Sequence, residues 1–404
     1  MAITQRGRAG ALASVSAMAL LVAGGATAGE WEIEVSGYME QYLGFSDYDA
    51  TGAPNRDAFD AGLETDFHVR PAFIADNGLK FGADFNIEGS ASTNGMSDAE
   101  IDAAFLFVRG SFGEVLIGDH ELAGNRLQPR TPGTRGPGPD ITFDSISSGS
   151  MSNFIAFSGS VDGVRTGGDI RRGSLGSTRI AFGGEDLSAG ISYFTPRFAG
   201  FQLGVSYVPD AGDSVFGSPD YRDVRDVFDI GASYSGSFGE AQVTLSGRWA
   251  TADNRFDPRA DPQLWGGGIN IVIGDLSIGG SWAEIRGTSR GRNDGVSYDI
   301  GVQYDLGPWT YSAAHFHGQN TDNEHIGFGP KERLDAFRIG ASYDLKHPAS
   351  RWSPPGLLGW AEEARLFGSV STICFTEDVG DLGFGTPGND VDGFVIATGL
   401  RLTF

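Results

Sequence analysis

The sequence predicts an all-β protein: a transmembrane antiparallel β-barrel of sixteen strands over residues 29–404. Three observations support this fold. Segments of about ten residues alternate apolar and polar side chains, as strands of a membrane barrel do. Short turns alternate with long polar loops along the chain. Glycine is abundant, at 62 residues, and aromatic residues make up 11% of the chain. This composition in short alternating segments is typical of β-structure rather than helix.

Residues 1–28 have the features of a secretory signal peptide. Arg6 and Arg8 supply the positive start, residues 17–23 supply an apolar stretch, and residues 26–28 supply a small-residue cleavage site. The apolar stretch is far shorter than the roughly 20 residues that a membrane-spanning helix needs. We therefore expect cleavage, with the mature chain beginning near Gly29.

The period-two alternation is clearest at the C-terminus. From residue 394 to residue 404, the even-numbered side chains are apolar except Thr398, and the odd-numbered ones include Gly399 and Arg401. The same pattern recurs in residues 79–88, 201–208, 296–305 and 337–345. A soluble sandwich also alternates. Here, however, one face carries charge and glycine along whole strands, and aromatic residues of the other face lie beside turns. These features favour a wet interior and a membrane-facing exterior.

Seven short connections and eight longer loops separate the sixteen predicted strands. The short connections are residues 76–78, 111–113, 196–197, 237–239, 274–275, 307–308 and 346–360. The longer loops are residues 46–62, 90–97, 119–184, 209–225, 251–262, 286–293, 318–331 and 377–392. An even strand number places both chain ends on one side, and bacterial barrels combine short periplasmic turns with long external loops. Closure leaves no strand edge with unpaired backbone groups in lipid.

Charge and cysteine content exclude some classes of function. The net charge is −23, and without the signal peptide's two arginines it is 27 − 52 = −25. This acidity disfavours nucleic-acid partners, which require clustered Lys and Arg. The single cysteine, Cys374, excludes an intrachain disulfide. We expect no cofactor, although acidic external loops offer sites for Ca²⁺ or another divalent cation.

The serial order of these features resembles the general diffusion porins of Gram-negative bacteria, in particular the trimeric sixteen-stranded type of α-proteobacteria. The resemblance is carried by the last strand ending in Phe404, by residues 191–208, and by the hairpin 103–118 before a very long third loop. It implies an outer-membrane, water-filled channel for ions and small hydrophilic solutes. In that family the barrel-assembly machinery reads the terminal Phe, so Phe404 would take that role.

The resemblance also implies partners. The channel would be a homotrimer in contact with outer-membrane lipid and lipopolysaccharide. Residues 101–108 are hydrophobic on both faces of their predicted strand, which is compatible with a subunit interface.

The same resemblance implies that the third loop, residues 119–184, folds into the pore and narrows it. In that family, acidic residues on this loop face basic residues on the barrel wall across the pore. The loop candidates are Asp140 and Asp144, and the wall candidates with polar-face parity are Arg70, Lys80, Arg338 and Arg401. A lipid-facing charge at mid-membrane costs about 2–4 kcal/mol, so we expect these basic residues to point inward. The loop is long enough for an extra hairpin, near residues 152–160.

Several alternatives remain open at this point. The loop holds seven arginines against six acids within a very acidic chain, and we expect a weak cation preference. A channel selective for sugars or anions, an outer-membrane enzyme and a soluble lectin-like protein are the other candidates. No hydrolase, metalloprotease or phosphate-loop motif is present, so no catalytic residues are predicted. His315 and His317 share a strand face, but two histidines are too few to predict a metal site.

Overall fold

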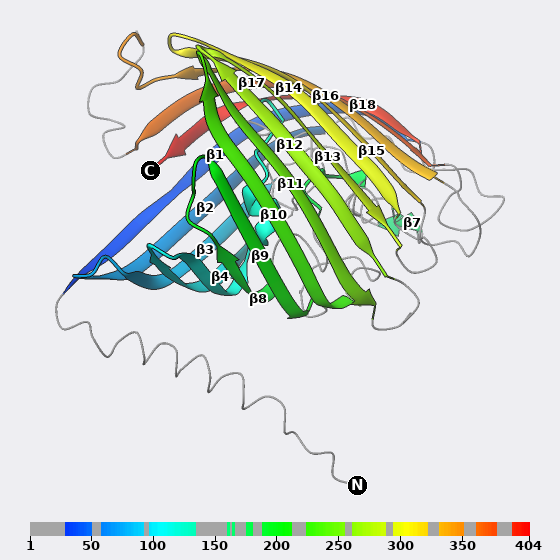
Figure 1. Ribbon diagram of the computed structural model, residues 1–404. Helices are drawn as coiled ribbons and strands as arrows, with labels where there is room; N and C mark the ends of the chain where they lie inside the picture. The colour runs from blue at the N-terminus through cyan, green and yellow to red at the C-terminus, as the bar shows by residue number, and fades with distance from the viewer. Residues whose placement is uncertain are drawn as a thin grey trace.

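The computed structural model describes residues 29–50, 58–92, 97–134, 160–161, 164–165, 175–180, 188–211, 224–254, 261–287, 294–321, 331–350, 361–377 and 390–404. Sixteen strands in these ranges form one closed antiparallel barrel, which confirms the predicted fold (Figure 1). The predicted signal peptide, residues 1–28, lies outside the described residues.

Each barrel strand pairs with its neighbours in chain order. The barrel strands are β1 (Gly29–Ala50), β2 (Ala58–Ala75), β3 (Lys80–Ser92), β4 (Ser97–Gly110), β5 (Gly113–His120), β8 (Ser188–Phe194), β9 (Phe201–Asp210), β10 (Val224–Phe238), β11 (Ala241–Asn254), β12 (Gln263–Ile273), β13 (Leu276–Arg286), β14 (Gly295–Leu306), β15 (Trp309–Thr321), β16 (Lys331–Asp344), β17 (Glu363–Glu377) and β18 (Val391–Thr403). Between β5 and β8 lie a short helix, α2 (Ala123–Leu127), and a two-stranded sheet, β6 (Ser160–Val161) with β7 (Val164–Arg165).

Six of the seven predicted short connections join strands where the sequence predicts. The seventh, 346–360, falls between β16 and β17, and its residues 351–360 lie outside the described residues. We call this end of the barrel the short-turn end and the other the long-loop end. Two boundaries differ from the prediction. The first loop is shorter than 46–62, because β1 continues to Ala50 while paired with β18 and β2 begins at Ala58. The small hairpin of the third loop is β6–β7, which begins at residue 160, where the predicted 152–160 hairpin was expected to end.

The chain ends close the barrel. Strand β1 pairs with β2 on one side and with β18 on the other. The terminal residue completes this seam, because Gly37 N donates to Phe404 O at 2.8 Å and Phe404 N donates to Gly37 O at 3.0 Å. The Phe404 ring lies 5.1 Å from the Phe67 ring. The last residue is therefore part of the closure rather than a free tail.

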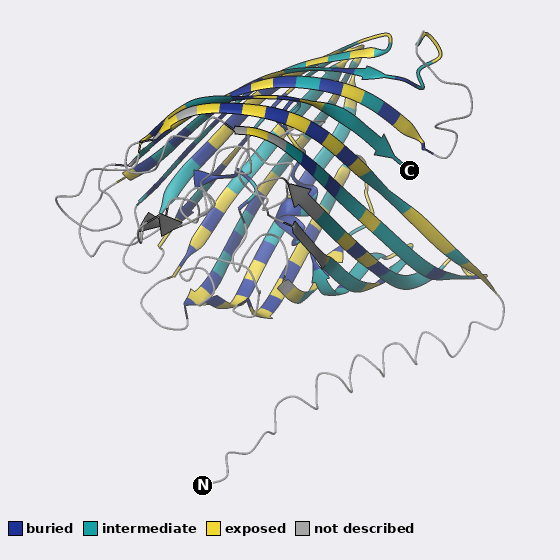
Figure 2. Cartoon of the chain, turned by 180° about the vertical axis from the view of Figure 1, so that it is seen from behind, coloured by how far each residue is buried: buried dark blue, intermediate teal, exposed yellow. Residues whose placement is uncertain are grey.

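The two faces of the barrel wall differ as the alternation predicts. Along most strands, exposed and buried residues alternate (Figure 2). The exposed set on the outer face is large and apolar, and includes Ile300, Phe337 and Ile396. Near the long-loop end, an outward row of aromatic side chains, which we call the outer girdle, comprises Trp249, Trp265, Trp282 and Tyr298. Trp309, Tyr311 and Tyr343 form a matching group at the short-turn end.

No helix in the described ranges is long and apolar enough to cross a membrane.

The two faces of β14 should respond differently to charge. Ile300 points outward near the middle of the strand, whereas Gln303 points inward. Replacing Ile300 by Lys should lower the free energy of unfolding in lipid vesicles by about 2–4 kcal/mol, because the charge then faces hydrocarbon. Gln303→Lys is the matched control and should change it little. Urea titration of both variants measures the difference, and equal losses would refute the assigned faces.

Candidate functional site

Part of the third loop lies inside the barrel. Helix α2 and residues 128–134 run along the inner wall from β8 to β16, and residues 175–180 return beside them. We call these two pieces together the inward segment. At its start, Ala123 N donates to Ser206 Oγ of β9 at 2.8 Å. The described part of the third loop therefore lies against the inner wall, and the predicted narrowing of the pore by residues 119–184 stays a prediction.

A buried ion pair on the wall holds both pieces of the inward segment. Arg248 of β11 and Asp229 of β10 lie 2.6 Å apart, with side chains 1% and 0% exposed. Gly124 N donates to Asp229 Oδ1 at 2.5 Å, and Arg248 Nη1 donates to Ile180 O at 2.6 Å. Arg248 also donates to Asn125. Because these additional hydrogen bonds accompany the ion pair, the buried charges are compensated.

A second buried acid, Asp299 of β14, binds both pieces again. It accepts hydrogen bonds from Thr131 of the first piece and from Thr178 of the second, the latter at 2.9 Å. Ser281 N and Oγ each donate to Asp299 at 2.8 Å. A carboxylate with this many donors is satisfied without water. Asp299 and the Arg248–Asp229 pair therefore hold the inward segment at two points along the wall.

Glycines on the wall make room for this close approach. A Cβ at Gly231 would lie 2.7 Å from the carbonyl oxygen of Ala123, and one at Gly301 would collide with the carbonyl oxygen of Pro132. A side chain at either position would push the inward segment away from the wall. Glycine on the polar face of these strands therefore has a packing role, because it lets the inward segment lie close to the wall.

The wall opposite the inward segment, formed by β18 and β1–β4, carries paired charges. Arg70 lies 2.5 Å from Asp84 and 2.8 Å from Glu34, and Lys80 lies 2.8 Å from Glu32. The side chains of Arg70 and Lys80 are each 25% exposed. Each basic residue therefore faces carboxylate rather than open water alone.

Further pairs extend this arrangement. Arg401 lies 3.4 Å from Glu40 and 3.7 Å above the Tyr38 ring. Beside this wall, Glu114 of β5 binds Arg109 of β4 and Arg126 of helix α2, at 2.5 and 2.7 Å, and so links the inward segment to the barrel. Burial lowers the pKa of the Arg126 guanidinium, and the nearby Glu114 opposes that shift.

The same wall carries additional carboxylates. The register sets Glu40 of β1 directly against Glu64 of β2, and Asp66 of β2 against Glu88 of β3. In these described strands the bases of the inner face are Arg70, Lys80, Arg109 and Arg401. They are outnumbered by inner-face carboxylates, which include Glu32, Glu34, Glu40, Glu64, Asp66, Asp84 and Glu88. Negative charge therefore predominates on this side of the lumen.

The structure separates the predicted wall residues. Arg70, Lys80 and Arg401 lie on the wall opposite the inward segment. Arg338 lies beneath the inward segment, 2% exposed, and donates to Gly133 O at 3.1 Å. Asp140 and Asp144 lie outside the described residues.

Sequence reasoning missed three residues that hold the inward segment: Asp229, Arg248 and Asp299. The sequence feature that could have identified them is a charged side chain at a position of the alternation that faces the barrel interior. Two of them, Asp229 and Arg248, come together only because β10 pairs with β11, where Arg248 lies opposite Gly231, two residues from Asp229.

One buried serine and histidine pair bears on the enzyme alternative. His120 Nε2 lies 2.7 Å from Ser192 Oγ, and Ser192 Oγ lies 2.6 Å from Ser206 Oγ. The other imidazole nitrogen lies 2.8 Å from Gly118 O, a carbonyl, where a catalytic triad has a carboxylate. His120 is only 1% exposed. The pair instead anchors the start of the inward segment, through Ser206.

Among the described residues, no group of three or more His, Cys, Asp or Glu side chains is arranged to hold a metal ion.

Comparison with known proteins gives one family and a set of similar folds. The family model of Gram-negative porins matches residues 11–350. The anion-selective porin from Comamonas acidovorans is 17% identical, with a TM-score of 0.54, over 93% of this chain and 100% of that one. A structure named "Asymmetric conductivity of engineered proteins" is 17% identical, with a TM-score of 0.51, over 92% and 100%. No curated protein matches the sequence. At such identities the structural likeness shows the fold alone.

The buried Arg248–Asp229 pair should govern how tightly the inward segment is held. Arg248→Leu leaves Asp229 buried without its partner, which costs about 3–5 kcal/mol. Trypsin should then cleave the folded barrel faster after Arg126 and Arg130, and single-channel current should become noisier.

Two further variants make this prediction specific. Arg248→Leu combined with Asp229→Leu should restore much of the protection, since no unpaired charge remains. Arg225→Leu removes a half-exposed ion pair with Asp226 and should have little effect. Cleavage at the wild-type rate in Arg248→Leu would contradict the assigned role.

Proposed function

This chain belongs to the Gram-negative porin family, and we propose that its outer-membrane diffusion channel passes ions and small hydrophilic solutes with a weak preference for cations. The observation that carries the preference is the charge of the wall opposite the inward segment. There, Arg70 and Lys80 each face a carboxylate, and further acids such as Glu64 and Asp66 adjoin them. A pore with excess negative charge concentrates cations over anions.

A channel selective for anions is the second candidate, because the Comamonas acidovorans structure that resembles this fold is described as anion-selective. The charge of the present wall argues against it. An anion-selective pore would need Lys or Arg side chains that form no ion pair with a carboxylate, such as the rings of basic residues in anion channels. A sugar-selective channel would need an inward aromatic track, whereas most exposed aromatic residues described here face outward.

We propose that the channel has no enzymatic activity. The support is the family and fold, together with a buried His120–Ser192 pair whose imidazole faces a carbonyl. Residues Asp140 and Asp144 remain proposed as the loop side of the constriction, facing Arg70, Lys80 and Arg401 across the lumen. Arg338 belongs to the constriction as a support of the inward segment.

We propose a homotrimer that contacts its neighbours through β1–β4. The outer face of these strands is apolar: Ile33, Phe85, Ile101 and Leu106 are all exposed there. A contiguous exposed apolar surface marks a lipid-facing or subunit-facing wall. The stretch 101–108, apolar on both faces in the sequence, lies in this region.

The proposed route to the membrane has two steps. Residues 1–28 direct export and are removed, and the barrel-assembly machinery then recognises the C-terminal strand with Phe404. In the membrane, the outer leaflet supplies lipid and lipopolysaccharide as partners. Acidic residues at the long-loop end, including Asp49 and Asp390, offer sites for Ca²⁺ or another divalent cation.

Planar-bilayer recording of the mature protein tests the channel itself. We expect stepwise conductance in groups of three, as three pores open together. Absence of conductance from folded protein would exclude this function, and single unlinked steps would exclude the trimer.

Selectivity should move in opposite directions when opposite charges of one ion pair are removed. Arg70→Gln should raise the permeability ratio of K⁺ to Cl⁻, and Glu34→Gln should lower it. Unit charges about 4 Å apart in water interact by about 1 kcal/mol, so each change should be a fewfold. Reversal potentials in a salt gradient measure the ratio. Asp253→Asn, which faces outward at the long-loop end, is the control and should leave it unchanged. Changes of the same sign in both variants would contradict the proposal.

Removal of Phe404 should impair assembly more than it impairs the finished channel. Its backbone closes the seam with Gly37, and its ring packs against Phe67. Deleting Phe404 should leave most of the chain unassembled in cells, as measured by heat-modifiable gel mobility, whereas Phe404→Tyr should assemble. Normal assembly of the deletion variant would exclude a role for the terminal residue.

A further inference from the structure

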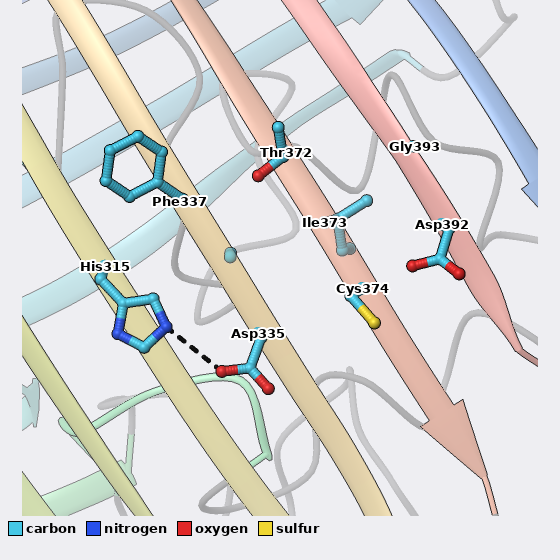
Figure 3. A pocket seen from close by; sticks show the side chains of 9 residues that line it. His315, Asp335, Phe337, Thr372, Ile373, Cys374, Asp392 and Gly393 are labelled. Atoms are coloured by element: carbon cyan, nitrogen blue, oxygen red, sulfur yellow. Dashed lines mark hydrogen bonds and ion pairs between the residues drawn. The ribbon is translucent and has the colours of Figure 1, made fainter.

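The outer wall carries a polar cavity beside a stretch of the exterior that is apolar. It lies over β15–β18 toward the long-loop end and has a volume of about 460 Å³. Its outward side chains include His315, Asp335, Phe337, Thr372, Cys374 and Asp392 (Figure 3). Next to the cavity on its short-turn side, the outward residues are apolar again: Ile339, Val370 and Ile396 are all exposed. We call this feature the outer-wall cavity.

The strand register places this cavity at the edge of the membrane. One continuous row of paired residues runs Trp282, Tyr298, His317, Asp335, Cys374, Asp392. The row begins in the outer girdle and ends at Asp392, the second residue of β18 at its long-loop end. Aromatic girdles mark the level of the lipid headgroups. The cavity therefore faces headgroups rather than hydrocarbon.

The central carboxylate of the cavity is held in position. His315 Nε2 and His317 Nδ1 lie 3.2 and 2.9 Å from the same oxygen, Asp335 Oδ1. The His317 ring stacks on Tyr298 of the outer girdle, with centroids 5.0 Å apart. Because both imidazoles bind one oxygen, the carboxylate orientation is fixed while its side chain stays 47% exposed. Figure 3 shows Asp335 in this bond with His315, with Cys374 and Asp392 on the next two strands.

The chemistry of the cavity favours hydroxyl groups over phosphate. Two carboxylates, imidazole nitrogens and the Thr372 hydroxyl accept hydrogen bonds, whereas a phosphate would meet like charge at Asp335 and Asp392. The exposed ring of Phe337, at 46%, offers an apolar surface beside them. A polyhydroxylated ring presents hydroxyls at its edge and C–H groups on its faces. The volume lies within the usual range for ligand pockets, about 300–1,000 Å³.

We propose that the outer-wall cavity binds the sugar headgroup of a glycolipid in the outer leaflet. The inference rests on the outer-leaflet lipid partner proposed above and names its site and the part recognised. Sugar hydroxyls donate to Asp335 and Asp392, and the C–H face of the sugar ring packs against Phe337. The lipid chains then lie against the apolar outer wall below, at Ile339 and Val370.

The test uses the mature barrel in detergent with a diacylglycerol that carries an uncharged glucose disaccharide as the probe, and native mass spectrometry counts the bound molecules. The test variant replaces Asp335 and Asp392 together by Leu, a residue suited to an outer wall, so the barrel should still fold. We expect its affinity for the probe to fall at least tenfold. The control is Asp253→Leu, an outward acid at the long-loop end of β11, which should bind as the wild type does.

Two comparison ligands identify what is recognised. A free, uncharged glucose disaccharide should compete with the probe, and phosphatidylglycerol should not. Equal binding by the double variant, an equal loss in Asp253→Leu, or phosphatidylglycerol binding as tightly as the probe would each overturn the proposal. Conductance is measured on the same samples. A wild type that binds the probe but does not conduct would refute the proposed channel and leave this site standing.

Discussion

The requirement that every backbone hydrogen bond be made within the sheet is the constraint on which the rest of this structure depends. Lipid offers no partner for a free N–H or C=O, so the sheet must close. Closure is completed by the last residue, where Phe404 and Gly37 exchange backbone hydrogen bonds. Once the sheet is closed, every second side chain faces out and its neighbour faces in. Apolar exterior and polar interior then follow from the sequence alternation alone.

The interior uses this geometry to hold a piece of its own chain. The inward segment fits where Gly231 and Gly301 leave space on the wall, and it is fixed by Asp299 and by the Arg248–Asp229 pair. Buried charges of this kind are stable only when all their partners are present. The opposite wall is built differently, because its ion pairs are partly exposed and adjoin excess acid. One side of the barrel therefore holds the inward segment, and the other side presents partly exposed charges to the lumen.

Much of the fold was predictable because its information is local. Alternation, turn residues and an even count of connections identified the sixteen strands and their short turns, and parity placed Arg70, Lys80 and Arg401 on the inner face. Contacts of the inward segment were not predictable in this way. Arg338 binds Gly133, 205 positions earlier in the chain, and nothing in either neighbourhood specifies that meeting. The roles of Asp229, Arg248 and Asp299 depend on the same long-range docking. Asp140 and Asp144 lie outside the described residues, so their place in the constriction stays a prediction.

The central claim is that alternate residues of one strand face water and membrane, and cysteine labelling along β2 tests it most directly. In a Cys374→Ser background, single cysteines replace Asp66, Phe67, His68 and Val69, and a charged, membrane-impermeant thiol reagent is applied to protein in lipid vesicles. Positions 66 and 68 should react and reduce the single-channel current, whereas positions 67 and 69 should stay unlabelled. Uniform labelling, or labelling of positions 67 and 69 alone, would contradict the assignment of the two faces and with it the channel.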